Sequence, residues 1–487
     1  MTRAPPSVDS SDTMAVRFLG PWSDFAVLGV IAAGLLARAY QADYNFDSDE
    51  AFSVRLAAHR FAEVITLSLA DRPHPPLYNI VLHFWLSVFG ISEVAARSLS
   101  IVFSVGFLVV SAVLLRRFAA PSIAAGALLL LAISPFFVYY GEQARPFALI
   151  ALLAAGNLLA YFRLLENAGN RKRLVAWAVT CALLVYAQHV GILVIGLEVL
   201  VALLGLPAAR LRILMVGAGA GLLVAPWAIL GMGHAMLTHA DPLSEISWIE
   251  TPTITDLVWF YVAIFGSSAA HARWLGLVLA VLGVAYLGVT YFPGPVRRLR
   301  VPMEHVFILL MAFGLPGFCY LISVLGPKPI FASRHLISGA LSLVAVLALC
   351  LDALPGAAAA GFISALALWM AVALPEAFPR SAKPPWRAIA GAIDASYRSA
   401  AIYTKESWIA APLAYYLKSN TVSLLAPTAA PNELGAVLVM CRAHFCHDFE
   451  SDPLKSRSSV VASWTWGVGA EHRYDLSVLR LYQLNSR

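Results

Sequence analysis

The chain has 487 residues, of which 60% are hydrophobic and only 13% are charged. Repeated apolar runs of about 17 to 22 residues can each cross a hydrocarbon core roughly 30 Å thick, which excludes a soluble globular protein. The net charge of +6 is typical of basic cytoplasmic loops in a membrane protein, so we expect no nucleic-acid partner. The sequence therefore predicts a mainly α-helical polytopic membrane protein.

About eleven segments are expected to span the membrane. They cover residues 24–41, 98–115, 121–138, 147–163, 174–188, 190–206, 213–231, 274–292, 305–325, 335–353 and 357–374. Basic residues fall on alternate loops, which places the amino-terminal tail, residues 1–23, in the cytoplasm. No clear small-residue cleavage pattern follows the first apolar run, so we interpret that run as a retained anchor. We expect a multi-pass protein of the bacterial inner membrane.

The first outer loop, residues 42–97, is unusually rich in charge. Asp49 and Glu50 follow the first span directly. A stretch with helical potential comes next, and Arg72 and His74 follow that stretch. Residues 76–90 are too short to span comfortably, and a crossing there would break the alternation of basic loops. We therefore expect them to form an amphipathic helix along the outer surface.

Three further outer loops are expected. Residues 134–146 carry Glu142 and Arg145, residues 231–273 include a surface helix at 254–266, and residues 326–335 carry Lys328 and Arg334. Outer loops are usually poor in basic residues. An anionic ligand would explain these arginine and lysine side chains.

Residues 375–487 have shorter apolar runs that alternate between strand-like and helix-like patterns. They predict a small α/β domain outside the membrane, following a transmembrane catalytic domain at 24–374. Cys441 and Cys446 lie in this tail and could form a local disulfide or stay as two buried thiols. A zinc cluster with His444 and His447 is a third, weaker interpretation, because the spacing matches no strong zinc pattern.

Several stretches, in this order, resemble one family of membrane enzymes. They are Asp49-Glu50, HPPLY at 74–78, FGISEVAARSLS at 89–100, SPFFVYYGEQARPFAL at 134–149 and FASRHLI at 331–337. Together they are similar to the dolichyl-phosphate-mannose protein mannosyltransferase and ArnT-like branch of the GT-C glycosyltransferases. His335 stands where that branch commonly has Tyr.

The resemblance implies a GT-C-like bundle that transfers one sugar from a polyprenyl-phosphate-linked donor to a lipid, glycan or protein acceptor at the outer face. Asp49 is then expected to be the general base, with Glu50 and Glu142 as further catalytic carboxylates. The donor phosphate is expected to be bound by basic side chains at five positions: Arg72, His74, Arg145, Lys328 and Arg334.

The chemistry of the donor agrees with this choice of residues. A sugar phosphodiester loses an already ionised phosphate, so cations must balance the charge that develops there. The acceptor instead needs a carboxylate that takes its proton while it attacks the anomeric carbon, with inversion. The carboxylates could also hold Mg²⁺ or Mn²⁺, but the many basic groups favour catalysis without a metal, so no metal ligand is assigned.

Glu198 lies in the middle of an apolar run. Acidic residues inside a membrane are often functional, although a polar partner on a neighbouring helix would also explain it. Glu198 supports the alternative of a transporter or lipid flippase, while a scaffold whose tail binds a partner is a third interpretation. Transporters usually place polar sites at the midplane of repeated halves, whereas the charges here gather in outer loops.

Overall fold

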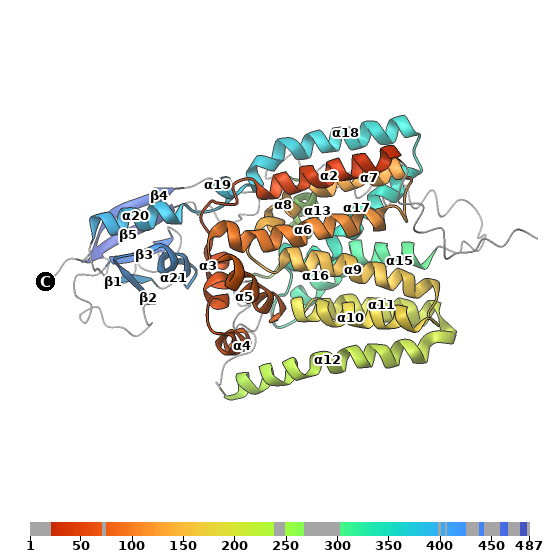
Figure 1. The fold of residues 1–487 in the computed structure, drawn as a ribbon, viewed down its shortest axis with the longest axis horizontal. Coiled ribbons are helices and arrows are strands. Elements are labelled where there is room, and N and C mark those ends of the chain that lie inside the picture. The colour runs from red at the N-terminus through yellow and green to blue at the C-terminus, as the bar shows by residue number, and fades with distance from the viewer. Residues whose placement is uncertain are drawn as a thin grey trace, which may run out of the picture.

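A computed structural model describes the protein over most of its length. The described residues are 21–70, 75–237, 249–266, 302–397, 401–404, 407–424, 438–442, 458–465 and 478–484. A bundle of long helices makes up the larger part, and a small sheet with two helices lies beyond one end of it (Figure 1).

The bundle consists of helices that run roughly side by side. They are α2 (Pro21–Ala39), α6 (Glu93–Leu115), α7 (Pro121–Ile133), α8 (Pro135–Glu142), α9 (Phe147–Glu166), α10 (Arg171–Ala187), α11 (Gly191–Gly205), α12 (Arg210–Leu237), α15 (Met303–Leu309), α16 (Leu315–Leu325), α17 (Ile337–Asp352) and α18 (Gly356–Ala373). A π-helical turn, Leu310–Gly314, joins α15 to α16. Apolar side chains such as Phe25, Leu222 and Val372 point outward, each about 70% exposed. Such an apolar exterior is what a lipid-facing surface requires.

Six helical segments among the described residues are long and apolar enough to cross a membrane, and the bent pair α7–α8 would be a seventh. The protein is therefore a multi-pass membrane protein. This count does not confirm the expected number of about eleven spans, because α2, α10 and α11 are not among the counted segments. The helices α10 and α11 have only 17 and 15 residues. The span expected at 274–292 lies outside the described residues.

A break between α7 and α8 bends the pair by 55°. Pro135 begins α8 directly after α7 ends, which leaves the last carbonyl groups of α7 without helical partners. The buried guanidinium of Arg38 on α2 donates to the carbonyl oxygens of Leu131 and Ala132, and also to that of Phe137 in α8. Arg38 thus stabilises the bend between α7 and α8.

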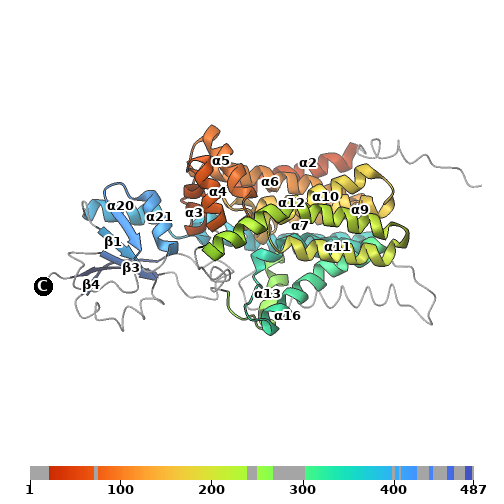
Figure 2. The same cartoon turned by 90° about the horizontal axis from the view of Figure 1, so that it is seen from below.

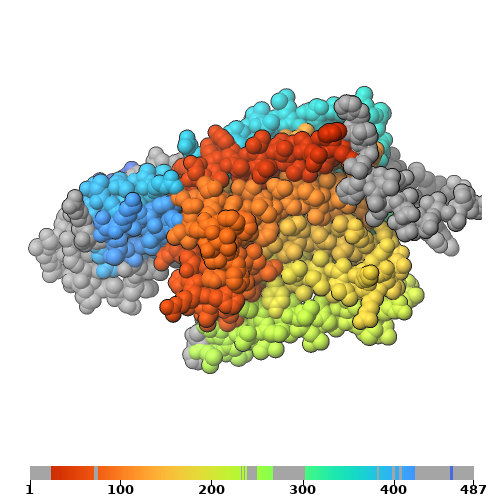
Figure 3. All heavy atoms as spheres, in the orientation of Figure 1, coloured from red at the N-terminus to blue at the C-terminus, as the bar shows by residue number. Residues whose placement is uncertain are grey.

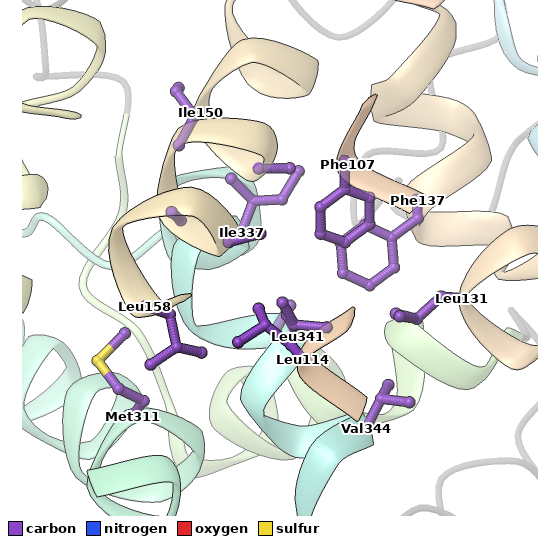
Figure 4. Close-up of a cluster of buried hydrophobic side chains, with 14 of the residues drawn as sticks. Phe107, Leu114, Leu131, Phe137, Ile150, Leu158, Met311, Ile337, Leu341 and Val344 are labelled. Carbon is purple, nitrogen blue, oxygen red and sulfur yellow. The ribbon is translucent and has the colours of Figure 1, made fainter. Parts of the chain in front are cut away.

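The bundle core is built from large apolar side chains that meet from several helices (Figure 4). Phe107 of α6 stacks on Phe137 of α8 with ring centroids 5.1 Å apart. Leu158 of α9 and Leu341 of α17 belong to the same buried cluster. Because these contacts join α6, α8, α9 and α17, the positions of the loops between those helices are fixed by one core.

Three short helices between residues 42 and 97 cover the end of the bundle nearest the sheet: α3 (Ser48–Ala57), α4 (Phe61–Ala70) and α5 (Leu77–Phe89) (Figures 1 and 2). The stretch with helical potential is divided into α3 and α4, because Glu63 accepts a hydrogen bond from the Arg60 backbone and starts a new helix there. The helix α5 agrees with the amphipathic helix expected at 76–90, with Leu82 buried and Val88 exposed. The surface helix expected at 254–266 is α13 (Ile254–Phe265).

The small α/β domain is confirmed. The described part of this domain contains five strands, β1 (Ala401–Thr404), β2 (Thr421–Leu424), β3 (Leu438–Arg442), β4 (Ser458–Thr465) and β5 (Val478–Leu484), which form a mixed sheet in the order β2-β1-β3-β5-β4. The helices α20 (Trp386–Ser396) and α21 (Ser407–Tyr416) contribute Trp386, Ile389 and Leu413 to its core. Cys446 lies outside the described residues, and so do the disulfide and zinc interpretations that involve it.

Candidate active site

Asp49 lies in the first turn of α3, where a reciprocal cap fixes the backbone. The Asp47 side chain accepts a hydrogen bond from the Glu50 amide at 2.8 Å, and the Glu50 side chain accepts one from the Asp47 amide at 3.0 Å. This capping box holds the start of the helix. The carboxylate of Asp49 itself is 46% exposed and is therefore open to a water-soluble or membrane-surface reactant.

Two guanidinium groups approach Asp49 from distant parts of the chain. Arg334, on a 3-10 turn before α17, donates to the Asp49 carboxylate at 3.3 Å. Arg145, in the loop between α8 and α9, places a nitrogen 4.0 Å from the same oxygen. Arg145 is also held in place by α3, because it donates a hydrogen bond to the hydroxyl of Ser53 at 2.8 Å. The expected acid and two of the expected phosphate-binding cations thus lie together.

Of the other three expected basic residues, the structure describes Lys328. Lys328 is partly exposed in the short loop that also leads to Arg334. Arg72 and His74 lie outside the described residues.

Glu50 and Glu142 belong to a buried ion-pair network rather than to the exposed surface beside Asp49. Arg97 of α6 binds Glu50 in a bidentate manner, at 2.8 and 2.7 Å, with both side chains fully buried. The ammonium of Lys383 lies between the two carboxylates, 3.0 Å from Glu50 and 2.6 Å from Glu142. Arg97 also lies 3.2 Å from Glu142. Two negative and two positive side chains therefore balance one another inside the protein.

Glu50 stays ionised in spite of its burial. Burial would raise the pKa of Glu50, but the attraction of Arg97 and Lys383 outweighs it and holds that pKa well below its usual range.

The oxygens of Glu50 are occupied by hydrogen-bond donors. Besides Arg97 and Lys383, the backbone amides of Asp47 and Ala144 donate to them. A carboxylate has about four lone-pair positions, so Glu50 has little capacity left for a substrate proton. Asp49 is the carboxylate whose surroundings suit a general base.

Arg97 and Lys383 are site residues that the sequence interpretation did not select. Arg97 stands near the start of an otherwise apolar helix, and a charge in such a place needs a partner, so that signal was present. Lys383 gave no such signal, because 333 positions separate it from Glu50 in the chain.

Within the part of the chain that the structure describes, no group of three or more His, Cys, Asp or Glu side chains is placed to hold a metal ion.

Glu198 is buried where three bundle helices meet. Trp177 of α10 donates its indole N–H to the Glu198 carboxylate at 2.8 Å, and Cys181 lies 3.7 Å from the same oxygen. Tyr161 of α9 donates to the backbone carbonyl of Glu198 at 2.8 Å. These partners hold one oxygen of the carboxylate, whereas the other, Oε1, is buried with no hydrogen-bond partner among the described residues.

Comparisons with known proteins were made on sequence and on structure. No protein-family model matches the chain, and no curated protein matches it in sequence. The crystal structure of ArnT from Cupriavidus metallidurans bound to undecaprenyl phosphate matches it with a TM-score of 0.59 and 11% identity, over 94% of this chain and 98% of that one.

Two other solved structures have TM-scores too low to carry an argument. The oligosaccharyltransferase of Archaeoglobus fulgidus in complex with zinc and sulfate has a TM-score of 0.46 and 12% identity, over 80% of this chain and 61% of that one. The mycobacterial arabinofuranosyltransferase AftD has a TM-score of 0.45 and 16% identity, over 95% of this chain and 41% of that one. The resemblance seen in the sequence is confirmed at the level of the fold: this chain has the fold of ArnT.

Proposed function

We propose that the protein is a glycosyltransferase that moves a single sugar from a polyprenyl-phosphate-linked donor to a lipid, glycan or protein acceptor. The fold supports this proposal, since ArnT was solved with undecaprenyl phosphate bound. The single observation that carries it is the partly exposed Asp49 carboxylate beside Arg334 and Arg145.

The geometry suits an inverting displacement. Arg334 and Arg145 balance the charge that develops on the phosphate oxygens as the bond from the anomeric carbon to phosphate breaks. Asp49 takes the proton from the attacking hydroxyl or amine of the acceptor. The polyprenyl phosphate leaves with the bonding electron pair, and attack from the opposite side inverts the anomeric centre. Lys328 is proposed as a further cation for the phosphate, and no metal ion is required.

We also propose that the end of the bundle bearing α3–α5 faces the outside of a bacterial inner membrane. The opposite end gathers basic residues from several helix ends: Arg116 and Arg117 after α6, Arg163 in the last turn of α9, Arg171, Lys172 and Arg173 at the start of α10, and Arg210 and Arg212 at the start of α12. A basic end is expected on the cytoplasmic side. The amino terminus is then cytoplasmic, and the C-terminal domain is extracytoplasmic.

The test compares envelope lipids and glycans, by mass spectrometry, between cells with and without the gene. A sugar that is lost with the gene names both donor and acceptor, and wild-type protein should restore it. Asp49→Asn should not restore it, although the variant should accumulate in the membrane and melt like the wild type. Asp43→Asn is the matched control, because Asp43 is exposed in the same loop. A fully active Asp49→Asn variant would refute the assignment of the base.

A binding experiment separates the phosphate site from the base. Undecaprenyl phosphate is titrated into purified protein, and the bound fraction is read by native mass spectrometry. Arg334→Ala should weaken binding about tenfold, because a charge-assisted hydrogen bond is worth about 1.5 kcal/mol or more. Arg60→Ala is the control, since Arg60 is exposed in the first outer loop. Equal affinities for Arg334→Ala and wild type would exclude Arg334 from the phosphate site.

A further inference from the structure

We propose that Lys383 is a positioning residue that connects the C-terminal domain to Asp49 and Arg145 of the site. The roles of Asp49 as base and Arg145 as phosphate-binding cation rest on the proposed function. The contacts that connect Lys383 to these residues do not depend on it.

Lys383 stands at the entrance to the C-terminal domain. It follows α19 (Pro379–Ala382) and precedes α20, yet its side chain points into the membrane-domain end and is only 1% exposed. Its ammonium contacts Glu50 on α3 and Glu142 at the end of α8. One side chain thus joins three segments that are far apart in sequence.

The contacts of Glu50 extend this connection to both sides of the site. One Glu50 oxygen accepts from Lys383 and from the Asp47 amide, which begins the turn that carries Asp49. The other oxygen accepts from the backbone N–H of Ala144, the residue directly before Arg145. Because both backbone segments are held by the same buried carboxylate, a shift of Glu50 would move Asp49 and Arg145 together.

Charge balance explains why Lys383 is needed for this arrangement. Without its ammonium, Glu50 and Glu142 would share only Arg97, and one buried negative charge would lack compensation. Such a charge is costly enough that the group takes up a proton or the surrounding backbone opens. A change at Glu142 that removes one negative charge should therefore offset the loss of Lys383.

Neighbouring contacts show that the C-terminal domain is fastened to the first outer loop at this place. Asn45 donates to the carbonyl of Pro384 at 2.7 Å, and Tyr416 donates to Glu93 at 2.7 Å. Arg387 donates to the carbonyl of Asp43 at 3.1 Å. In the space-filling view the orange helices of the first loop meet the blue helices α20 and α21 (Figure 3). The C-terminal domain therefore packs against the segment that carries Asp49 and helps to hold it in place.

The experiment is a double-variant cycle with Lys383→Met, Glu142→Gln and the combined variant. Each is purified in detergent, its melting temperature is measured, and kcat and KM are determined with the donor identified by the mass-spectrometric comparison. Lys418→Met is the control, because Lys418 is an exposed lysine of the same domain.

Lys383→Met should melt lower than wild type and lose at least about tenfold in kcat, with a smaller change in KM, because misplacing a base by about 1 Å impairs the transition state most. The combined variant should recover most of the melting temperature and part of kcat. Wild-type melting and kcat in Lys383→Met, or strictly additive effects in the combined variant, would overturn the proposal.

The two proposals fail in different ways. If no sugar transfer exists, the melting cycle still reports the coupling between Lys383 and Glu142. If Asp49→Asn abolishes transfer while that cycle shows no coupling, only the role of Lys383 is rejected.

Discussion

Glu50 and Asp49 are adjacent carboxylates in α3, and their neutral variants should differ: Glu50→Gln should lose stability, whereas Asp49→Asn should lose activity. Glu50→Gln keeps the size of the side chain but removes its charge and replaces one carboxylate oxygen by an amide NH₂, which can only donate hydrogen bonds. That group would face donors, since Arg97, Lys383 and the Asp47 and Ala144 amides all donate to Glu50. Both Glu50 and Arg97 are fully buried, so water does not replace the lost partner.

Removing one partner of a buried ion pair typically costs about 3 to 5 kcal/mol. This is a large share of the roughly 5 to 15 kcal/mol that keeps a protein folded. We therefore expect Glu50→Gln to melt many degrees below the wild type and to accumulate poorly in the membrane. Asp49→Asn, by contrast, should melt normally and lose only the activity.

The assay is thermal unfolding of the purified variants in one detergent, together with their amounts in the membrane. Glu250→Gln is the control, because Glu250 is exposed. A Glu50→Gln variant that melts within a degree of the wild type but lacks activity would refute the structural role and return Glu50 to the catalytic carboxylates.

Three further predictions follow from other parts of the structure. Burial and the nearby Glu50 raise the pKa of Asp47 to about 7. The stability that the protonated Asp47 contributes is complete below the unfolded pKa of 3.8 and is lost as pH rises to 7, so the melting temperature should fall between about pH 4 and 7 and level off above it, and Asp47→Asn should abolish that slope. Gly141→Ala should lower the melting temperature because a Cβ there would lie 2.9 Å from the guanidinium of Arg38, whereas Gly156→Ala meets no atom within 4 Å and should not; equal melting of the two would contradict this packing. Glu198→Gln should retain sugar transfer in the complementation assay, and its complete loss would favour the transporter or flippase interpretation.

Local sequence patterns predict much of the fold. Apolar runs predict the bundle helices, the amphipathic pattern at 76–90 predicts α5, and shortening runs after residue 374 predict the α/β domain. A helix satisfies its own backbone, and the bilayer or core selects its apolar face, so short windows of sequence are sufficient for these predictions. Charge density likewise indicated Asp49 and Arg334, because polar groups in so apolar a chain need a reason.

Tertiary structure alone decided which carboxylate is exposed and which is buried. Asp49 and Glu50 are neighbours in sequence, yet successive positions of a helix point in different directions, and only the packing of α6 and the segment at Lys383 makes one of them interior. The bend between α7 and α8 likewise depends on Arg38, a side chain on another helix. Contacts between segments hundreds of residues apart leave no periodic trace in the chain, because they are selected by the shape and charge of the folded surfaces and not by local backbone preference.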